Sequence, residues 1–501
     1  MHLNPTFFKL NRASLLMVLA SFLFYIAFAY DLLRTDYVKL MVLYGALFFL
    51  FYKLIHFSKG NITFLTYVAF GFRAVFILAI PNLSQDFYRF IWDGRIILEG
   101  FNPYLYTVES FISRGEFPVA YAQELYAGMG RLNAGHFTNY PPVNQLCFVI
   151  ANLFPGQSIL SSVIGLRLII IAADFGTLYF GKKLLEKLKI PVYNIFWYIL
   201  NPFIIIELTG NLHFEGVMIF FLIWSLYLLY IGKWPWAGVV LALSISVKLI
   251  PLIFLPLFYQ WFVSGKSTKT PLKFPRGDNC SVSANEVKQS VSNNEIASSF
   301  SPGNDMKKVS TALNLAKLIT FYSIITITTI LLFAPFYSNT FVNNYTETVA
   351  LWFQNFEFNA SLYYIGREIG YLFTGYNEIA IIGKITPIIV VLFVLTLAFF
   401  RKNKSMAQLI TAMLFALSFY YFTATTVHPW YLATLLILSV FTKYKFPLVW
   451  SFVIILSYLA YININKADKS ENLWIIAIEY VIVYGVLIWE VFIKKASKLE
   501  A

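Results

Sequence analysis

Two aspartates and an arginine on one expected helix have the residue types and spacing for joint chemistry. Asp86, Arg89 and Asp93 occur at i, i+3 and i+7, which puts them on a single helical face. Carboxylates in such a position can exchange protons with a bound group, and a guanidinium beside them can hold an anion. A solvated ion pair on an interfacial helix is the alternative interpretation of the same pattern.

Further ionisable residues interrupt apolar segments elsewhere in the chain. Ionisable groups at membrane depth are costly and usually face a bundle interior or a water-filled cavity, which makes Glu215 and Lys248 functional candidates. Lys248 could instead extend its amine to an interface, and His213 with Glu215 could be a pair at a helix end without catalytic duty. Trp430 is expected to be an aromatic-belt anchor. Other polar clusters contain Tyr140-Pro141-Pro142, Arg367 and His428.

An amphipathic helix must position the first three residues. Its apolar residues form one stripe at i, i+3, i+4, i+7, i+10 and i+11, made of Phe87, Phe90, Ile91, Gly94, Ile97 and Leu98. This pattern predicts an interfacial helix that lies on the bilayer surface in the first large outer loop. Gly100 is suited to the end of that helix.

Composition excludes a soluble protein. Of the 501 residues, 59% are hydrophobic and only 13% are charged, whereas a soluble domain carries roughly 25% charged residues. Apolar runs that are long enough to cross about 30 Å of hydrocarbon recur along the chain. The sequence therefore predicts an all-α, polytopic integral membrane protein with about 12–14 transmembrane helices.

The net charge of +13 does not indicate a nucleic-acid partner, because the basic residues gather in short loops beside the spans, where they fix orientation. Cys147 lies in an apolar segment and Cys280 in a polar loop, so we expect no disulfide and no cysteine function. No cofactor is expected. No metal site is predicted either, although Asp86 with Asp93 could hold an ion.

The basic loops assign the chain to two sides of the membrane. Those at 9–12, 53–59, 401–404, 443–445 and 494–495 can all lie on one side, which is then the cytoplasm. Loops 81–140 and 337–377 then lie outside. The basic stretch 181–190 is cytoplasmic if 141–155 dips in without crossing and 234–263 makes two passes. It faces outward if 141–155 crosses and 234–263 is one span; charge favours the first arrangement.

A polar segment separates two membrane parts. Residues 264–315 are rich in Ser, Asn and Lys and lack Trp and Tyr, which is typical of a flexible linker. We expect residues 1–263 to form an N-terminal catalytic module, with its motif in the outer loop 81–140. Residues 316–501 are expected to form a C-terminal transmembrane bundle, and the linker to be cytoplasmic.

Taken together, these clusters resemble a known family. The chain is similar to the GT-C glycosyltransferases, and within them to bacterial and archaeal polyprenyl-phosphate-mannose-dependent mannosyltransferases. The resemblance covers roughly residues 60–260 and depends on Asp86 to Tyr106, Tyr140-Pro141-Pro142, Asn201-Pro202, Asn211 to Glu215, and Lys248 to Pro251. Family members often have one span before the first outer loop, whereas three are expected here.

The resemblance implies an enzyme that moves a hexose, mannose by this likeness, from a polyprenyl-phosphate donor. It places the active site on the outer face of the plasma (inner) membrane, with inverting displacement, Asp86 as general base and Asp93 as the second member of the acidic pair. The departing phosphate needs cations or donors. The residues available to bind donor phosphate or substrate are Arg89, Arg95, His213, Glu215, Lys248, Arg367 and His428.

Two other classes of function are compatible with these residues. A transporter or lipid-linked-glycan flippase could use the buried charges as a substrate path, although the half-to-half symmetry of many transporters is missing. A non-catalytic scaffold that acts through the linker is the second. The identity of the sugar stays open, as does the acceptor, which could be a glycan, a glycolipid or a protein; membrane lipids are expected partners.

Overall fold

The computed structural model describes residues 12–154, 156, 158–264, 302–354, 356–465 and 471–494. In these ranges every regular element is a helix, and the extended pairing found is an isolated bridge between Phe358 and Thr426. The backbone N–H and C=O groups of a helix form hydrogen bonds with one another, and hydrocarbon offers them no other partner. The expected all-α, polytopic membrane architecture is confirmed.

Seven helical segments in the described ranges are long and apolar enough to cross a membrane. They are α2 (Arg12–Tyr30), α3 (Tyr37–Ser58), α9 (Ile159–Leu188), the segment Thr311–Phe336 of α15 and η4, α18 (Ile379–Phe399), α19 (Met406–Thr423) and α22 with η7 (Leu473–Ile493). The bent pair Val192–Ile199 and Pro202–Gly210 can count as an eighth.

Short and broken helices explain why this number is below the about 12–14 spans expected from hydropathy. Six further apolar segments have only 10–17 residues: α4 (Ile62–Val75), α12 (Glu215–Tyr230), α13 (Trp234–Ile245), η3 with α14 (Ile250–Val263), η5 with α20 (Pro429–Val440), and α21 with part of η6 (Phe446–Ala460). Proline lies in the first turn of α13, η3, η5 and α21. There its fixed φ starts a new helix and its missing N–H cannot continue the previous one.

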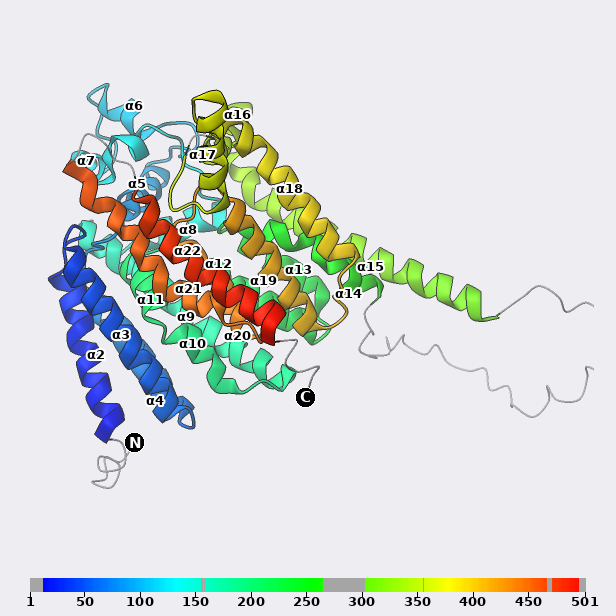
Figure 1. Cartoon of the computed structure of the whole chain (residues 1–501). Coiled ribbons are helices and arrows are strands. Elements are labelled where there is room, and N and C mark those ends of the chain that lie inside the picture. Colours follow the sequence, from blue (N-terminus) through cyan, green and yellow to red (C-terminus); the bar gives the residue numbers. More distant parts are fainter. Residues whose placement is uncertain are drawn as a thin grey trace, which may run out of the picture.

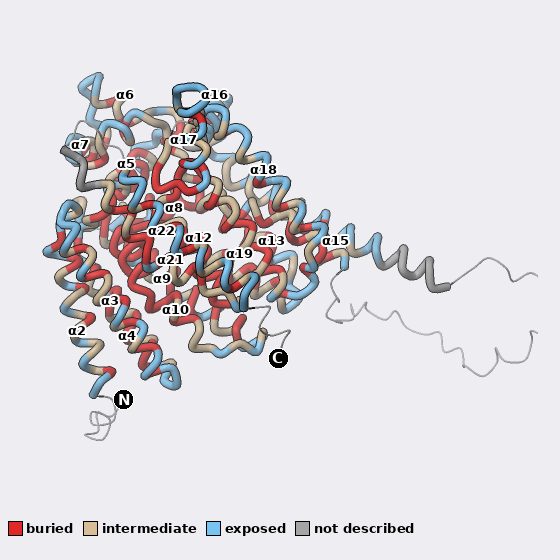
Figure 2. Tube along the Cα trace, in the orientation of Figure 1, coloured by how far each residue is buried: buried red, intermediate tan, exposed pale blue. Residues whose placement is uncertain are grey.

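The two long polar excursions of the chain lie at one end of the molecule, which we call the excursion end. α5 (Asp86–Leu98), α6 (Val108–Ile112) and α7 (Ala122–Ala134) lie there together with α16 (Asn339–Gln354) and α17 (Leu362–Thr374) (Figure 1). The start of α2 (Arg12), the end of η7 (Ile493) and α10 (Phe196–Ile199) lie at the opposite end, which we call the terminal end. Buried residues gather between these ends, around α8 (Pro142–Asn152), α9 and α12 (Figure 2).

The structure shows the path of the chain around residues 181–190, and the side of the membrane on which they lie stays a prediction. α8 has only 11 residues, which is too short to cross a bilayer. α12 and α13 run antiparallel, because Ser244 Oγ, near the end of α13, donates to the carbonyl of Met218, near the start of α12. The chain then turns at Lys248 and continues through η3 and α14. α9 leads directly into η1 and α10, so residues 181–190 lie at the terminal end (Figure 1).

Part of the expected linker is helical. α15 (Pro302–Phe333) begins within residues 264–315, so residues 302–315 do not behave as the sequence predicted. Lys307, Lys308, Ala312, Leu313 and Ala316 are all good helix formers, which accounts for the early start. Residues 265–301 lie outside the described residues, and the division into modules 1–263 and 316–501 stays a prediction.

The helix that carries the first motif, α5, is packed inside the protein, so its apolar stripe faces other helices rather than the bilayer. Arg89 and Asp93, on its polar face, are both buried. A Cβ atom on Gly94 would lie 2.4 Å from the carbonyl oxygen of Phe148, so only glycine lets α5 approach α8 this closely. Phe90 stacks on Phe148 with ring centroids 4.6 Å apart. The apolar stripe of α5 therefore serves packing on α8.

Candidate active site

A buried ion pair joins two helix boundaries toward the excursion end. Lys248, in the turn between α13 and η3, donates to Glu215, the first residue of α12, over 2.6 Å. The Glu215 side chain is 3% exposed and that of Lys248 is 19% exposed, so the ammonium is the accessible partner. It also lies 5.9 Å from the ring centre of Tyr140. A lysine that extends to the lipid interface does not fit these contacts.

Asp86 begins α5 beside this ion pair. Its side chain is half-buried, and burial is the largest influence on it, raising the pKa of Asp86 above its usual range. Lys248 and Arg34 lower that pKa, whereas Glu215 raises it. Asp86 thus combines a raised proton affinity with nearby cations, which is the combination that a general base beside an anionic leaving group requires.

Arg34 is a site residue that the sequence did not reveal. It lies in the turn between α2 and α3 and is half-buried. Its positive charge lowers the pKa of both Asp86 and His428, so the turn reaches the same region as Lys248. A usable signal was present: Arg34 is a basic residue in a short loop on the side assigned to the outside, where the charge rule predicts few.

A stack of four rings connects the N-terminal and C-terminal parts of the chain at this place. His213 stacks on Trp430 with centroids 3.7 Å apart, and Trp430 stacks on His428 at 4.6 Å. Phe358 stacks on His428 in turn, at 5.1 Å. Trp430 is thus held between two histidines and is not the belt anchor that the sequence suggested. We call His213, Trp430, His428 and Phe358 the ring stack.

The histidine in the middle of the ring stack is neutral. Burial, with the positive charges of Lys248 and Arg34, lowers the pKa of His428 to about 3. A neutral imidazole can donate and accept hydrogen bonds but cannot neutralise a phosphate. His428 therefore fits a hydrogen-bonding role better than the cationic role considered from sequence.

Several buried polar atoms around the Lys248–Glu215 pair make no hydrogen bond to the described residues. They are Glu215 Oε2, His213 Nε2, Ser246 Oγ, His428 Nδ1 and both amide atoms of Asn144. Asn144 follows Val143, whose backbone N–H donates to the Ser246 carbonyl. Buried polar groups nearly always have partners, including water and ligands. A cluster of donors and acceptors of this kind suits a ligand with many hydroxyl groups.

The structure separates Asp93 from Asp86. Asp93 is paired with Arg89 over 2.7 Å through one oxygen, and its other oxygen accepts from Gln145 over 3.1 Å. Arg89 also donates to the carbonyls of Asn133 and His136. Both carboxylate oxygens of Asp93 are engaged, so it does not face a shared aqueous space with Asp86, nor does it offer an oxygen for the shared ion considered from sequence. Asp93 and Arg89 act as a structural pair.

Arg95 and Arg367 also bind protein groups away from Asp86. Arg95 donates to Asn152, to Ser162 and to the carbonyls of Ala120 and Ser158, and so ties α5 to α8 and α9. Arg367 on α17 pairs with Glu357 at 2.8 Å and with Glu368 at 3.0 Å. Neither arginine joins the cluster of Asp86, Glu215 and Lys248. Their expected role in phosphate binding has no geometric support.

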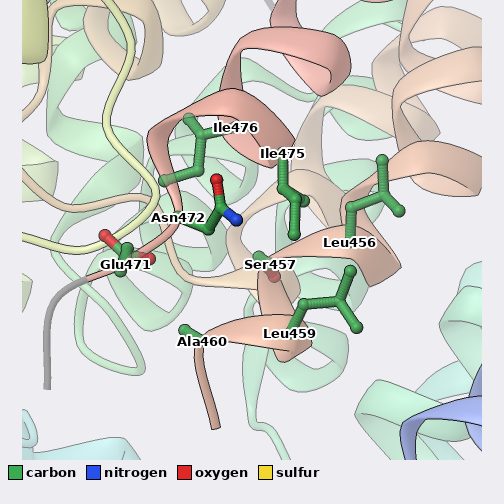
Figure 3. Close-up of a pocket in the computed structure, with 8 residues that line it drawn as sticks. All are labelled: Leu456, Ser457, Leu459, Ala460, Glu471, Asn472, Ile475 and Ile476. Atoms are coloured by element: carbon green, nitrogen blue, oxygen red, sulfur yellow. The ribbon is translucent and has the colours of Figure 1, made fainter. Parts of the chain in front are cut away.

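A small crevice lies in the C-terminal part, between η6 (Ile454–Asn465) and the start of α22 (Figure 3). Its lining is mostly apolar, and Glu471 is the carboxylate among the lining residues. That carboxylate accepts the backbone N–H of Asn359 at 2.9 Å and bonds to the hydroxyl of Tyr364. The crevice therefore lacks an unengaged acid or cation of the kind found around Asp86.

Comparison with known proteins adds the decisive observation. Residues 32–264 match the N-terminal domain of the alpha-(1->6)-mannopyranosyltransferases, the MptA/B family. The chain thus carries the N-terminal domain of this family. It is a membrane mannosyltransferase, a multi-pass integral membrane protein that needs a mannose donor and a glycan acceptor. No curated protein matches the chain.

The matched range contains most of the cluster and excludes part of it. Arg34, Asp86, Glu215 and Lys248 all lie within residues 32–264. His428, which is one of the two histidines of the ring stack, and Trp430 lie beyond it. The family's N-terminal domain thus provides the charged groups, and the rest of the chain completes their surroundings.

Proposed function

We propose that this mannosyltransferase takes mannose from a polyprenyl-phosphate donor and transfers it to an acceptor hydroxyl, with Asp86 as general base. The observation that supports the proposal most is the meeting of Asp86 with Lys248 and Arg34. The proton acceptor and the cations come together at a half-buried site. This site is lined by polar atoms that make no hydrogen bond to the described residues. We propose both the polyprenyl-phosphate donor and the role of Asp86 as base.

The reaction is a single displacement at C1 of the mannose. The acceptor oxygen forms a bond to C1 while its proton passes to Asp86. The bond between C1 and the phosphate oxygen breaks, and its electron pair leaves with the polyprenyl phosphate. Such a displacement inverts C1, so an α-(1→6) product requires a β-linked donor and the 6-hydroxyl of the acceptor sugar.

Lys248 and Arg34 stabilise the departing phosphate. Preorganised cations in a partly desolvated site are worth more to a developing charge than they are in water. Glu215 holds Lys248 at 2.6 Å and so fixes the ammonium in place rather than binding the phosphate itself. His213 and His428, neutral in the ring stack, are suited to hydrogen-bond sugar hydroxyls.

The excursion end is proposed to face the outside of the plasma membrane. Lys53 and Lys59 near the α3–α4 turn, residues 181–190 and residues 401–404 bring positive charge to the other end of the bundle. Positive charge of this kind marks the cytoplasmic side. A polyprenyl-phosphate sugar would then meet Asp86 from the outer leaflet.

The contacts that the buried charges make argue against the transporter alternative. Arg73 is paired with Asp174 over 2.8 Å, both side chains being fully buried. Arg167 donates to the carbonyls of Thr209 and Gly210, at the end of the π-helix η2 (Ile205–Gly210). It also donates to the carbonyl of Ile77. These groups hold helices together and do not form a substrate path.

The test supplies membranes containing the protein with labelled polyprenyl-phosphate mannose and an α-(1→6)-linked oligomannoside. We expect labelled product one mannose longer, with an α-(1→6) linkage, and none with Asp86→Asn at equal protein level. Transfer from a nucleotide-linked mannose but not from the lipid donor would overturn the donor assignment. Full activity of Asp86→Asn would overturn the base.

A further inference from the structure

Helix α17 exposes a stripe of large apolar side chains. Leu362, Ile365, Ile369, Leu372 and Phe373 are all exposed, with values of 83% for Leu372 and 84% for Phe373. They occur at i, i+3, i+7, i+10 and i+11, which places them along one face of the helix. We call these five residues the α17 stripe.

The side of α17 opposite the stripe faces the protein. Arg367 donates to Glu357 over 2.8 Å, and the hydroxyl of Tyr363 donates to the same carboxylate over 2.7 Å. Tyr363, Tyr364 and Gly370 are buried. The stripe is thus directed away from the core, and the polar contacts fix the rotation of the helix.

Neighbouring helix α16 has the opposite character. Its outward residues include Asn343, Thr346 and Glu347, all exposed and polar. Both helices lie at the excursion end (Figure 1). A difference of this size between adjacent helices indicates that α16 faces water and that α17 faces something apolar.

Continuity with the membrane identifies what covers the stripe. α18, which is long and apolar enough to span a bilayer, begins five residues after α17 ends. Its first turns expose Ile381, Ile385 and Ile388, so the apolar surface continues from the span into α17. A Cβ atom on Gly370 would lie 3.0 Å from Cγ of Glu378, just before α18, so α17 approaches the start of α18 closely at this glycine.

We propose that α17 lies in the membrane interface, with its stripe inserted at the boundary between lipid headgroups and acyl chains. An exposed apolar stripe on a helix that leads directly into a membrane span fits a helix that lies in the interface plane. This inference does not depend on the donor or the base proposed above.

The position also relates lipid to the ring stack. Residues 356–361 connect α16 to α17, and Phe358 in this segment stacks on His428 at 5.1 Å. The backbone N–H of Phe358 donates to Thr425 and that of Val427 donates to Phe358. A helix fixed in the interface thereby fixes one ring beside the proposed sugar site.

The test measures depth with single cysteines. In a full-length Cys147→Ala, Cys280→Ser background, Ile365→Cys, Leu372→Cys and Phe373→Cys are labelled with a small fluorophore and reconstituted in phosphatidylcholine vesicles. Glu368→Cys on α17 and Thr346→Cys on α16 are the matched controls, both at exposed positions. Quenching by spin-labelled lipid is compared with quenching by aqueous iodide.

For the stripe positions we expect at least about twofold stronger quenching by the lipid probe and at least about twofold weaker quenching by iodide than for the controls. Equal iodide access at all five positions would overturn the proposal. Spontaneous cross-linking between copies at Leu372→Cys, without lipid quenching, would also overturn it, because a second copy of the chain would then cover the stripe. Neither readout depends on catalytic activity.

Discussion

Asp86 and Asp93 are seven residues apart on helix α5, yet their surroundings differ in every respect that matters for proton transfer. Asp86 is half-buried, its pKa is raised by burial, and Lys248 and Arg34 act on it. Asp93 is 1% exposed and gives both oxygens to Arg89 and Gln145. Equal spacing on a helical face does not give equal chemistry.

The difference follows from what packs on each turn of the helix. The start of α5 lies near the start of α12, where Phe90 contacts Phe214, and Lys248 acts electrostatically on Asp86. Farther along, α5 lies against α8, where Gly94 allows backbone contact and Phe90 stacks on Phe148. A carboxylate there has to be fully paired, because an unpaired buried charge is costly.

The largest effect is expected when Asp86 loses its ability to accept a proton. Asp86→Asn should lower kcat by about 10²–10⁴-fold, the usual contribution of a general base. Thermal stability should be unchanged or slightly higher, because a charge is removed from a partly buried position. The measurement is mannose transfer from the lipid donor per amount of purified protein.

Asp86→Glu is the matched control, since it keeps the carboxylate but moves it. It should retain more activity than Asp86→Asn. If both variants lose transfer equally and also unfold at lower temperature, Asp86 is structural and the contrast with Asp93 disappears.

Removing the accessible cation should have the next largest effect. Lys248→Met should lower kcat by about 10²–10³-fold, comparable with the loss of one preorganised donor to a developing anion. Glu215→Gln, which leaves the ammonium but weakens its anchor at 2.6 Å, should cost less. A larger loss for Glu215→Gln than for Lys248→Met would assign Glu215 a direct part in the reaction.

Asp93→Asn should affect stability more than chemistry. Breaking a buried ion pair from one side costs about 3–5 kcal/mol, so unfolding in detergent should begin at a clearly lower temperature. The fraction that stays folded should transfer mannose within about threefold of the original rate. The double change Arg89→Met, Asp93→Leu should recover part of the stability, because no charge is left unpaired. A stable but inactive Asp93→Asn protein would show that the second aspartate does take part.

The pH profile can sharpen the comparison further. A base must be deprotonated, so kcat/KM should fall on the acid side below the pKa of Asp86, which lies above the usual aspartate range. Arg34 lowers that pKa, so Arg34→Gln should move the acid limb to higher pH. Glu215 raises it, so Glu215→Gln should move the limb to lower pH. A limb that stays fixed in both variants would mean that another group titrates.

The smallest effect is expected at an arginine far from Asp86. Arg367→Gln should change kcat by less than about twofold, since its partners are Glu357 and Glu368 and none of these three side chains contacts Asp86 or Lys248. Thr346→Gln on α16 serves as a control for surface changes at the same end. A loss of transfer with intact stability would bring Arg367 back as a phosphate ligand.

The sequence predicted the membrane class because that class depends on composition and local pattern. Glu215 and Lys248 stand out as ionisable groups in apolar segments, and the structure brings them together. Residue 86 stands out through its helix-start motif. The number of long spans was predicted less well, because proline near helix starts divides apolar runs that hydropathy alone treats as continuous.

Long-range packing accounts for what the sequence did not reveal. The ring stack joins His213 with Trp430 and Phe358, residues that no local period connects. Arg34 comes from a turn about fifty residues before Asp86 in the chain. The amphipathic pattern of α5 is that of a surface helix. The helix that covers it, α8, is short and mixed in polarity, so nothing in its own pattern pointed to this packing.

The ring stack also limits how far this enzyme can be treated as two exchangeable modules. His213 comes from the part of the chain before residue 264, and Phe358, His428 and Trp430 come from the part after residue 302, so neither part alone contains the stack. A chimaera that takes its second half from a relative would import a new Trp–His pair against the resident His213. Compatibility at those faces, more than similarity in the charged residues, would decide whether such a hybrid enzyme works.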